Sequence, residues 1–348
     1  MKYDEIIDTI RSIVSGNTVD NDEMSAILRE HGCYYLLSKL PSQKQTVQIE
    51  LMFNRLVINR RYNACAGVFE QLSDIPYAVI KGAVLSKQIY GNTDYRFSGD
   101  IDILVPPKNA ESAKAILTDN SFVQGRVVGD KIVPYTRREL IYQKTFSHQL
   151  AAFVKATDDK LCPFVNIDVN TDIMWGESEA KTDMDRFLSN TIPYEIDGIA
   201  VKKLLPEEEF ISLCLHHYKD MNSIYLLSQG SLKLSLFCDI YFYVKNVTLD
   251  YSRLPHLAEK FKVSDYLYYC LYHTNKIFND SMMCQLCSPF ESDHAIELIN
   301  RYGLSYDEYH YRQHNIAELL FDSKFPENFV HTLTESEKAK IKTNKAMM

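Results

Sequence analysis

Residues 79–105 are VIKGAVLSKQIYGNTDYRFSGDIDILV, and this stretch carries the clearest structural signal in the chain. Its last six residues, DIDILV, begin with alternating polar and apolar side chains, which predicts a strand with a polar patch on one face. Asp100 and Asp102 then lie on the same side of that strand, with isoleucines on the other. Two neighbouring carboxylates repel each other unless a cation lies between them. The pattern therefore predicts a cation site, and hard oxygen ligands of this kind suit Mg²⁺.

A phosphate site is predicted just upstream of the acidic pair. A short β-prone run at 77–80 ends at Lys81 and Gly82, where a helical pattern begins. Gly82 lets backbone amides approach an anion, while the helix N-terminus and the Lys81 ammonium supply positive charge. The stretch thus predicts a phosphate, a metal and an acidic pair together.

The rest of the chain alternates between helical and β-prone text. Residues before Pro76 have helical periodicity, and four β-prone segments follow the acidic strand: FVQGRVV, KIVPY, LIYQKTF and PFVNIDVNTDIMW. After Trp175 the pattern turns helical again. The expected organisation has four parts: an N-terminal helical region at 1–75, a catalytic core at 76–178, a C-terminal helical domain at 179–335 and a polar, frayed tail at 336–348.

The last β-prone segment offers a third acidic residue. Asn166, Asp168, Asn170 and Asp172 share one face of a predicted strand, and apolar residues share the other. Four residues of strand separate Asp168 from Asp172 by about 13 Å, so only one of them can reach the metal site. We expect Asp168 to be that ligand, because it lies mid-strand among apolar neighbours, whereas Asp172 lies near the strand exit where water can solvate it.

The composition excludes several classes of protein. The 348 residues are 46% apolar and 24% charged, with 12 Gly and 11 Pro, unlike collagen-like, low-complexity or wholly disordered chains. The formal net charge of -8 makes a nucleic-acid partner unexpected. No window approaches the roughly 18 consecutive apolar residues of a membrane helix, and the first residues have no signal-peptide core. We therefore expect a cytoplasmic protein with no membrane association.

Eight scattered cysteines, several inside apolar runs, are expected to be reduced and packed. Cys284 and Cys287 form one C-x-x-C pair, for which zinc or redox use is the alternative to packing. The nearby His273 and His294 lack the tight spacing of a second ligand pair, which favours packing.

The acidic stretch and its surroundings resemble a known family. The spelling KG-x-x-L, then Tyr90, then Arg96, then Gly99-Asp100-Ile-Asp102 is similar to the uncharacterised nucleotidyltransferases of the DNA polymerase beta superfamily. Three later segments continue the resemblance: Ile167–Val169, Leu213–His217 and Leu234–Ile240. Together these motifs span residues 76 to about 245.

Two features depart from the family pattern. The superfamily's usual Gly-Ser or Gly-Gly doublet is Gly82-Ala83 here. The gap between that doublet and Asp100 is sixteen residues, 84 to 99, where the superfamily usually has about a dozen. A histidine that the narrower family often carries two positions after its third acid is Asn170 here.

The resemblance implies an α+β fold, in which a mixed β-sheet nucleotidyltransferase core like that of DNA polymerase beta is flanked by N-terminal and C-terminal helical regions. It implies an enzyme that binds a nucleoside triphosphate, expected to be ATP, with two Mg²⁺ ions and moves its nucleoside monophosphate to an acceptor with loss of pyrophosphate. The implied catalytic and metal-binding residues are Asp100, Asp102 and Asp168. The implied nucleotide-binding residues are Lys81, Gly82, Arg96, Ser98 and Gly99.

Several alternatives stay open at this stage. Arg96 is either a phosphate ligand or the partner of an acidic residue. His216 and His217 are either satisfied core or surface residues or catalytic ones, and Asp239 is either buried with a partner or on a polar seam. The expected acceptor is a hydroxyl or similar group on a small molecule or protein, while a silent nucleotide-binding scaffold and a toxin-like transferase acting on tRNA are the alternatives. The sequence determines neither the acceptor, the base nor the oligomeric state.

Overall fold

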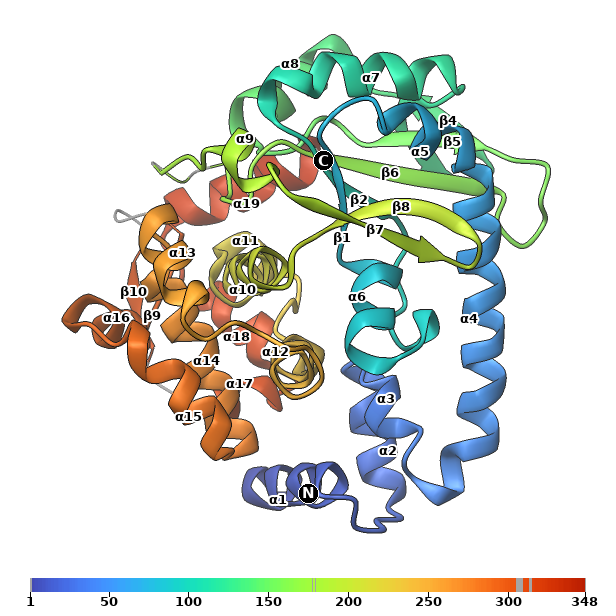
Figure 1. Ribbon diagram of the computed structural model, residues 1–348. Coiled ribbons are helices and arrows are strands. Elements are labelled where there is room, and N and C mark those ends of the chain that lie inside the picture. The colour runs from blue at the N-terminus through green and yellow to red at the C-terminus, as the bar shows by residue number, and fades with distance from the viewer. Residues whose placement is uncertain (1, 177, 179, 305–308, 313–314, 348) are drawn as a thin grey trace. The chain divides into compact units, whose positions relative to one another are not determined.

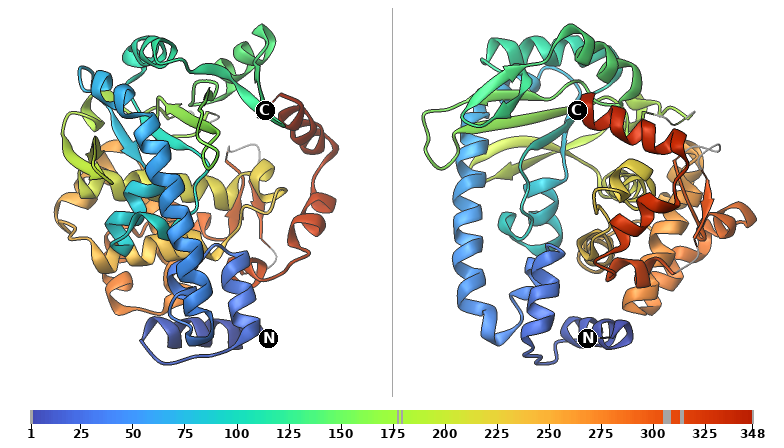
Figure 2. Two further views of the ribbon diagram at one scale, coloured as in Figure 1. Left: turned by 90° about the vertical axis from the view of Figure 1, so that its right-hand side faces the viewer. Right: turned by 180° about the vertical axis from the view of Figure 1, so that it is seen from behind.

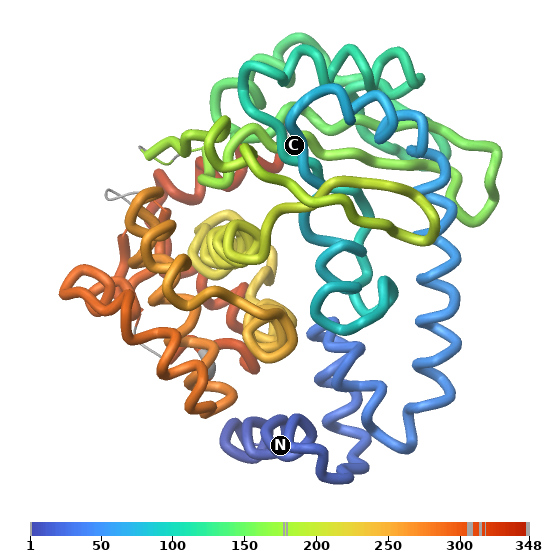
Figure 3. Tube along the Cα trace, viewed as in Figure 1, coloured from blue at the N-terminus to red at the C-terminus, as the bar shows by residue number. Residues whose placement is uncertain are grey.

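The computed structural model describes residues 2–176, 178, 180–304, 309–312 and 315–347 (Figure 1). The described chain divides into two compact units. The segment ending at Glu50 and the segment Phe210–Met347 form unit 1, and Leu51–Glu209 forms unit 2. Unit 2 is therefore inserted between the two segments of unit 1 in the sequence. Figure 3 traces the chain through these segments in order. The four-part organisation expected from the sequence stays a prediction.

Unit 2 is built around a mixed sheet of six strands within the described chain, in the order β1-β2-β6-β5-β3-β4. The strands are β1 (Ala78–Ile80), β2 (Ile101–Leu104), β3 (Val123–Val128), β4 (Lys131–Pro134), β5 (Phe153–Ala156) and β6 (Phe164–Asn170). β2 and β6 run parallel, and all other neighbours are antiparallel. The expected mixed-sheet α+β fold is confirmed.

Helices cover the apolar face of this sheet. The helices of unit 2 are α5 (Ala66–Leu72), α6 (Gly82–Tyr90), α7 (Ala110–Asp119), α8 (Arg137–Phe146) and α9 (Met184–Phe187). α4 (Lys44–Ala64) also contributes its residues from Leu51 onward. Apolar side chains of α4, α5, α6 and α7 share one buried cluster with those of β1, β2, β5 and β6. Figures 1 and 2 show α7 above the sheet, and its Ala113 and Leu117 belong to the buried cluster.

The alternation predicted for β6 is confirmed. Val165, Ile167 and Val169 are fully buried in the apolar cluster, while Asn166 and Asp168 on the other face are half-buried. A strand that buries one face against helices needs this period of two. The opposite, polar face of β2 and β6 is thereby left to the acidic residues.

One β-prone segment is helical in the structure. The predicted strand LIYQKTF lies within α8, Arg137–Phe146. Thr136 begins this helix with a capping box, in which its side chain accepts from the Glu139 amide and the Glu139 carboxylate accepts from the Thr136 amide. Such a box gives hydrogen-bond acceptors to two backbone amides at the start of the helix, which would otherwise have none within the helix. The prediction of a strand there is wrong because this capping signal was overlooked.

A hairpin also interrupts the text expected to be helical after Trp175. β7 (Thr191–Ile196) pairs antiparallel with β8 (Ile199–Leu204), and β8 lies beside β1. The turn residues Asp197 and Gly198 both have positive φ, 47° and 88°. Asp-Gly flanked by alternating apolar residues is a strong hairpin signal, because two successive positive φ angles suit these residue types.

Unit 1 is almost entirely helical. Its described helices are α1 (Tyr3–Val14), α2 (Asp22–Glu30), α3 (Tyr34–Leu37), α10 (Pro206–Asn222), which begins in unit 2, α11 (Ile224–Leu227), α12 (Leu234–Asn246), α13 (Arg253–Phe261), α14 (Ser264–Phe278), α15 (Ser281–Cys287), α16 (Asp293–Leu298), α17 (Ile316–Leu320), α18 (Phe325–Thr332) and α19 (Glu335–Met347). A short ribbon of β9 (Arg301–Tyr302) and β10 (His310–Tyr311) completes it.

Two sequence expectations meet unit 1 directly. The polar tail expected to fray is the helix α19, which begins with a Thr334–Glu337 capping box; Met348 lies outside the described residues. Among the described helices, none has both the length and the apolar content needed to cross a bilayer.

Candidate active site

Three carboxylates gather on the polar face of the β2–β6 pair. Asp102 of β2 is directly opposite Asp168 of β6 in the parallel register. Opposite residues of neighbouring strands point to the same face, and the strands are about 4.8 Å apart. Asp100 lies two residues before Asp102, at the entrance to β2. The structure therefore brings together all three acids that the sequence singled out.

Burial and mutual repulsion dominate the electrostatics of the acidic pair. Burial, and next the charge of Asp102, raise the pKa of Asp100 above its ordinary value. Ser98, Lys81 and Arg61 act in the opposite direction without cancelling the rise. The Lys81 ammonium lies 3.1 Å from Asp102 Oδ1 and supplies one cation. Carboxylate oxygens held against their own repulsion form a donor set that suits a hard divalent cation.

Lys81 and Gly82 occupy the predicted turn between β1 and α6. Both have positive φ, 57° and 45°. A Cβ on Gly82 would come within 3.5 Å of Ser98 Oγ, so this glycine brings the start of α6 against the loop that precedes β2. The first amides of α6 and the loop at Ser98 therefore lie side by side.

Ser98 and Gly99 shape the loop that leads into the acidic strand. The Ser98 hydroxyl lies 2.7 Å from the Asp100 carbonyl oxygen and 2.9 Å from Asp100 Oδ1. A Cβ on Gly99 would have no described atom within 4 Å beyond its chain neighbours, and the residue is exposed. The loop is thus fixed by Ser98 and open at Gly99.

Arg96 is placed by its backbone. Its carbonyl accepts a hydrogen bond of 3.2 Å from the Asn54 side chain of α4, which also donates to the Asp94 carbonyl. The residue is half-buried. Its predicted contact with phosphate stays a prediction.

Asp172 does not have the environment that the sequence suggested. We expected water to solvate it, but it is 7% exposed. Its two carboxylate oxygens accept from the backbone amides of Met174 and Thr182, at 2.9 and 3.2 Å. Asp172 therefore has a structural task in holding the chain after β6, and the expectation that it is solvated is wrong.

A model of one protein family matches most of the chain. The family is described as uncharacterised nucleotidyltransferase, and the match covers residues 17–279, about three quarters of the chain. The chain belongs to this nucleotidyltransferase family. It is accordingly an enzyme of nucleotidyl transfer. No match was found among curated proteins or among solved structures.

The surroundings of the three acids include residues to which the sequence assigned no role. The Asn170 amide donates to Asp102 Oδ1 at 3.1 Å and to the Ile103 carbonyl at 3.3 Å, while its own oxygen accepts from Gln149 at 2.7 Å. Asn170 thus orients one acidic side chain from the neighbouring strand. In the sequence, Asn170 stands out only by its place on the polar face of β6 and by replacing a histidine that the resembled family often carries there.

Arg61 of α4 is a second residue that the sequence did not single out. Its guanidinium donates to the Ser98 carbonyl at 2.7 Å, and the residue is buried. It is one of the groups that lower the pKa of Asp100. In the sequence it appears only as part of the basic pair Arg60-Arg61 within a helical segment, which gives no sign of this contact.

Tyr135 lies within electrostatic reach of Asp168 in this nucleotidyltransferase. Burial is the main cause of the raised pKa of Tyr135, and Asp168 is among the charges that add to it. The Arg126 guanidinium lies over the Tyr135 ring at 5.5 Å and donates to Glu139 at 2.6 Å. Hydrogen bonds from Thr136, and next from Arg126, lower the pKa of Glu139 to about 2. A charged, ordered group therefore lies beside β3 and β4.

Two of the later motifs, Leu213–His217 and Leu234–Ile240, contact each other in unit 1. His217 Nε2 of α10 lies 3.1 Å from Asp239 Oδ2 of α12, and both side chains are 1% exposed. The interpretation of Asp239 as buried with a partner is confirmed. His216, the neighbour of His217, lies 3.2 Å from Asp220.

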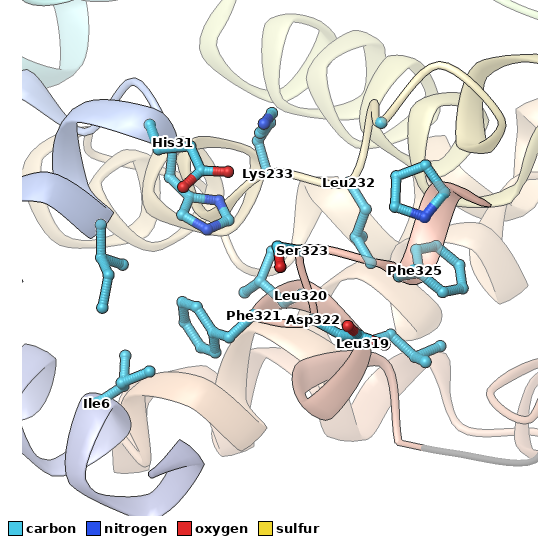
Figure 4. Close-up of a pocket in the computed structure, with 14 residues that line it drawn as sticks. Ile6, His31, Leu232, Lys233, Leu319, Leu320, Phe321, Asp322, Ser323 and Phe325 are labelled. Atoms are coloured by element: carbon cyan, nitrogen blue, oxygen red, sulfur yellow. The ribbon is translucent and has the colours of Figure 1, made fainter. Parts of the chain in front are cut away.

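Unit 1 also contains a small pocket of about 110 Å³ (Figure 4). His31 and Lys233 both line it, with apolar residues such as Leu320 and Phe325. Burial, and next the charge of Lys233, lower the pKa of His31 to about 4. Its Nδ1 accepts from the Leu234 amide at 3.1 Å, which requires a neutral ring. The pocket therefore contains a neutral histidine with a structural hydrogen bond.

Proposed function

We propose that this enzyme moves a nucleoside monophosphate from a nucleoside triphosphate to a hydroxyl or similar acceptor on a small molecule or protein, with Mg²⁺ and with release of pyrophosphate. The observation that carries the proposal is the register of Asp102 against Asp168 on parallel strands, with Asp100 two residues away. Three carboxylates on one polar face, in a family of nucleotidyltransferases, are the donor set that this chemistry needs.

The residues fit the proposed metal. The repulsion that raises the pKa of Asp100 is relieved by a cation between the carboxylates, and all three donors are hard oxygens. Asp100 and Asp102 would hold two Mg²⁺ ions between them, and Asp168 would complete the site on the acceptor side. When bound, such ions activate the attacking oxygen and neutralise the leaving pyrophosphate.

The nucleotide, which we expect to be ATP, is proposed to lie along the turn from β1 to α6. Gly82 and the first amides of α6 would face its phosphates, with Ser98 and Gly99 on the other side. Lys81 would exchange its contact with Asp102 for phosphate oxygens once the carboxylates hold cations. Arg96 would add a second positive charge for the transferred group.

The decisive experiment is nucleotide binding by calorimetry, with and without Mg²⁺, for the four common nucleoside triphosphates. A ligand at about 100 times its dissociation constant adds about 2.7 kcal/mol to stability, so a thermal-shift screen can be run first. We expect Mg²⁺-dependent binding that Asp102→Asn abolishes. Asp130→Asn, at an exposed residue of the β3–β4 turn, is the matched control and should bind as the native chain does.

Turnover is then tested by pyrophosphate release in the presence of a metabolite extract as acceptor source. Binding without any pyrophosphate release would favour the silent scaffold. Release that depends on added tRNA would favour the toxin-like transferase. Native release by both Asp100→Asn and Asp168→Asn would contradict the assigned site.

A further inference from the structure

Three side chains at the end of α10 gather in a way that the proposed Mg²⁺ site does not explain. One ring nitrogen each of His216 and His217 and a carboxylate oxygen of Asp220 all lie within 4.8 Å of one another. Asp220 lies four residues after His216 and three after His217, so it shares a face of the helix with each of them. Histidine and carboxylate together form a different donor set from the three acids of unit 2.

His217 is the best-positioned member of this group. Its Nε2 lies 3.1 Å from Asp239 Oδ2, so a neutral ring donates its Nε2 proton to that carboxylate. The Nδ1 atom of this ring then carries a free lone pair. Nδ1 is buried and has no hydrogen-bond partner among the described residues. A buried polar atom with no partner costs free energy, on the order of 1–3 kcal/mol. A ligand at Nδ1 would remove that cost.

The contact with Asp239 is itself what a metal-binding histidine needs. Histidine ligands almost always donate the N–H of their other ring nitrogen to a carboxylate, a carbonyl or water, which fixes the tautomer and makes the metal-binding nitrogen more basic. Asp239 comes from α12 and is as buried as His217, each 1% exposed. The neighbouring helix thus holds the ring of His217 in one tautomer and one orientation.

We propose that His216, His217 and Asp220 bind a transition-metal ion, with zinc the best fit. Two imidazoles and one carboxylate suit Zn²⁺ better than Mg²⁺, which prefers oxygen ligands alone. Three protein ligands leave the fourth tetrahedral position to water or to a further ligand. The separations of up to 4.8 Å must close to about 3.3 Å around zinc, since its bonds to nitrogen and oxygen are about 2.0 to 2.1 Å long.

The partial exposure of two of the proposed ligands would let an ion enter the site from solvent. The side chains of His216 and Asp220 are 23% and 19% exposed, while His217 is buried behind them. An ion can therefore reach the group from the His216 side, and the His216–Asp220 pair holds the site together before it arrives. This inference goes beyond the proposed transferase and does not depend on it.

The test uses the full chain, stripped of metal with a chelator and then titrated with Zn²⁺ or Co²⁺. We expect one tightly bound ion per chain, a rise in melting temperature and, with Co²⁺, the intense visible absorption of a tetrahedral site. His216→Ala and Asp220→Asn should each weaken binding at least tenfold. His256→Ala, at an exposed histidine of α13, is the matched control and should bind as the native chain does.

Asp239→Asn tests the positioning role. It leaves all three ligands in place, so binding should survive but weaken 10–100-fold, the usual loss for such a partner. Asp102→Asn, which should abolish the Mg²⁺-dependent binding of nucleotide, should leave zinc binding unchanged, so the two proposals fail separately. The inference is overturned if Zn²⁺ binds no more tightly to the native chain than to His216→Ala, or if Co²⁺ stays octahedral and pale. The close contact of His216 with Asp220 would then have no role in metal binding.

Discussion

Lys81 has a backbone conformation that L-residues rarely adopt. Its φ is 57° and its ψ is -151°, close to a region occupied almost only by glycine and costing on the order of 1–3 kcal/mol for other residues. The turn nevertheless carries a lysine, whose ammonium lies against Asp102. Backbone strain of this kind is concentrated at active sites and ligand-binding sites. This agrees with the phosphate-binding role proposed for Lys81.

A comparison of Lys81→Gly with Lys81→Ala separates the cost of the backbone strain from the role of the side chain. Both lose the ammonium, but only glycine relieves the strained φ. We expect the Gly variant to be more stable than the Ala variant by about 1–3 kcal/mol in denaturant unfolding, with nucleotide binding lost equally in both. Equal stability of the two variants would show that the turn relaxes and stores no strain.

The Asp102–Asn170–Gln149 chain of hydrogen bonds gives a second prediction. Asn170→Ala removes both donors to β2 and leaves the Gln149 amide without its acceptor, so we expect a loss of about 1–3 kcal/mol in stability and weaker Mg²⁺ dependence of binding. Gln149→Ala removes only the outer bond and is the graded control. A larger effect of Gln149→Ala on Mg²⁺ dependence would contradict the role given to Asn170.

At the scale of elements, the sequence predicted those strands and helices whose signal is local. β6 was found because one face of it is fully buried, which imposes strict alternation. α8 was missed because a β-prone composition was weighed above the Thr136–Glu139 capping box. The β7–β8 hairpin was missed although its Asp197-Gly198 turn is a local signal, because the helical text on either side outweighed six-residue strands.

One residue of this hairpin, Lys203, forms a buried ion pair with Glu209 of α10. Lys203 of β8 lies 2.9 Å from Glu209, and the two side chains are 3% and 5% exposed. Removing one partner leaves the other charge buried, so Lys203→Met should cost about 3–5 kcal/mol in unfolding free energy. The double variant Lys203→Met, Glu209→Leu should recover most of that loss.

Lys202→Met is the control for this pair. Its ammonium donates to the Ser73 carbonyl at an exposed position, so the change should cost under about 1 kcal/mol. A double variant as unstable as Lys203→Met alone would mean that Glu209 contributes through its other contacts rather than through Lys203.

At the scale of the whole molecule, the three acids could be predicted, but the groups around them could not. Asp100 and Asp102 are an i, i+2 pair, and Asp168 follows from strand alternation and the family resemblance. Asn170 reaches Asp102 across 68 residues of sequence, and Arg61 reaches Ser98 across 37. No local pattern encodes such contacts, since they depend on which strands and helices become neighbours.

Two buried histidines predict how stability depends on pH. Burial lowers the pKa of His31 to about 4 and that of His273 to about 3, whereas an unfolded histidine has a pKa of about 6.5. The unfolded chain therefore binds more protons below pH 6.5, and stability falls as the pH drops from there toward 4. Each ring contributes about 1.4 kcal/mol per pH unit, or roughly 2 kcal/mol between pH 6.5 and 5.

Denaturant unfolding at pH 7 and pH 5 checks this prediction. In His273→Gln and His31→Gln the loss of stability between the two values should be smaller by roughly 2 kcal/mol each, whatever the baseline stability of the variant. An unchanged loss in both buried-site variants would show that these rings do not remain neutral in the folded chain.

Unit 1 is discontinuous, and this has a consequence for the newly made chain. Arg11 of α1 donates to the carbonyl of Ile277, a residue 266 positions later. At about 5–20 residues per second, a ribosome needs roughly a quarter of a minute to a minute to deliver that partner. Unit 2 is complete before then. During this interval the isoleucines of α1 that end up buried, Ile6, Ile10 and Ile13 among them, remain in water. A nascent chain stalled before residue 277 should therefore offer chaperones an apolar helix face that the finished protein hides.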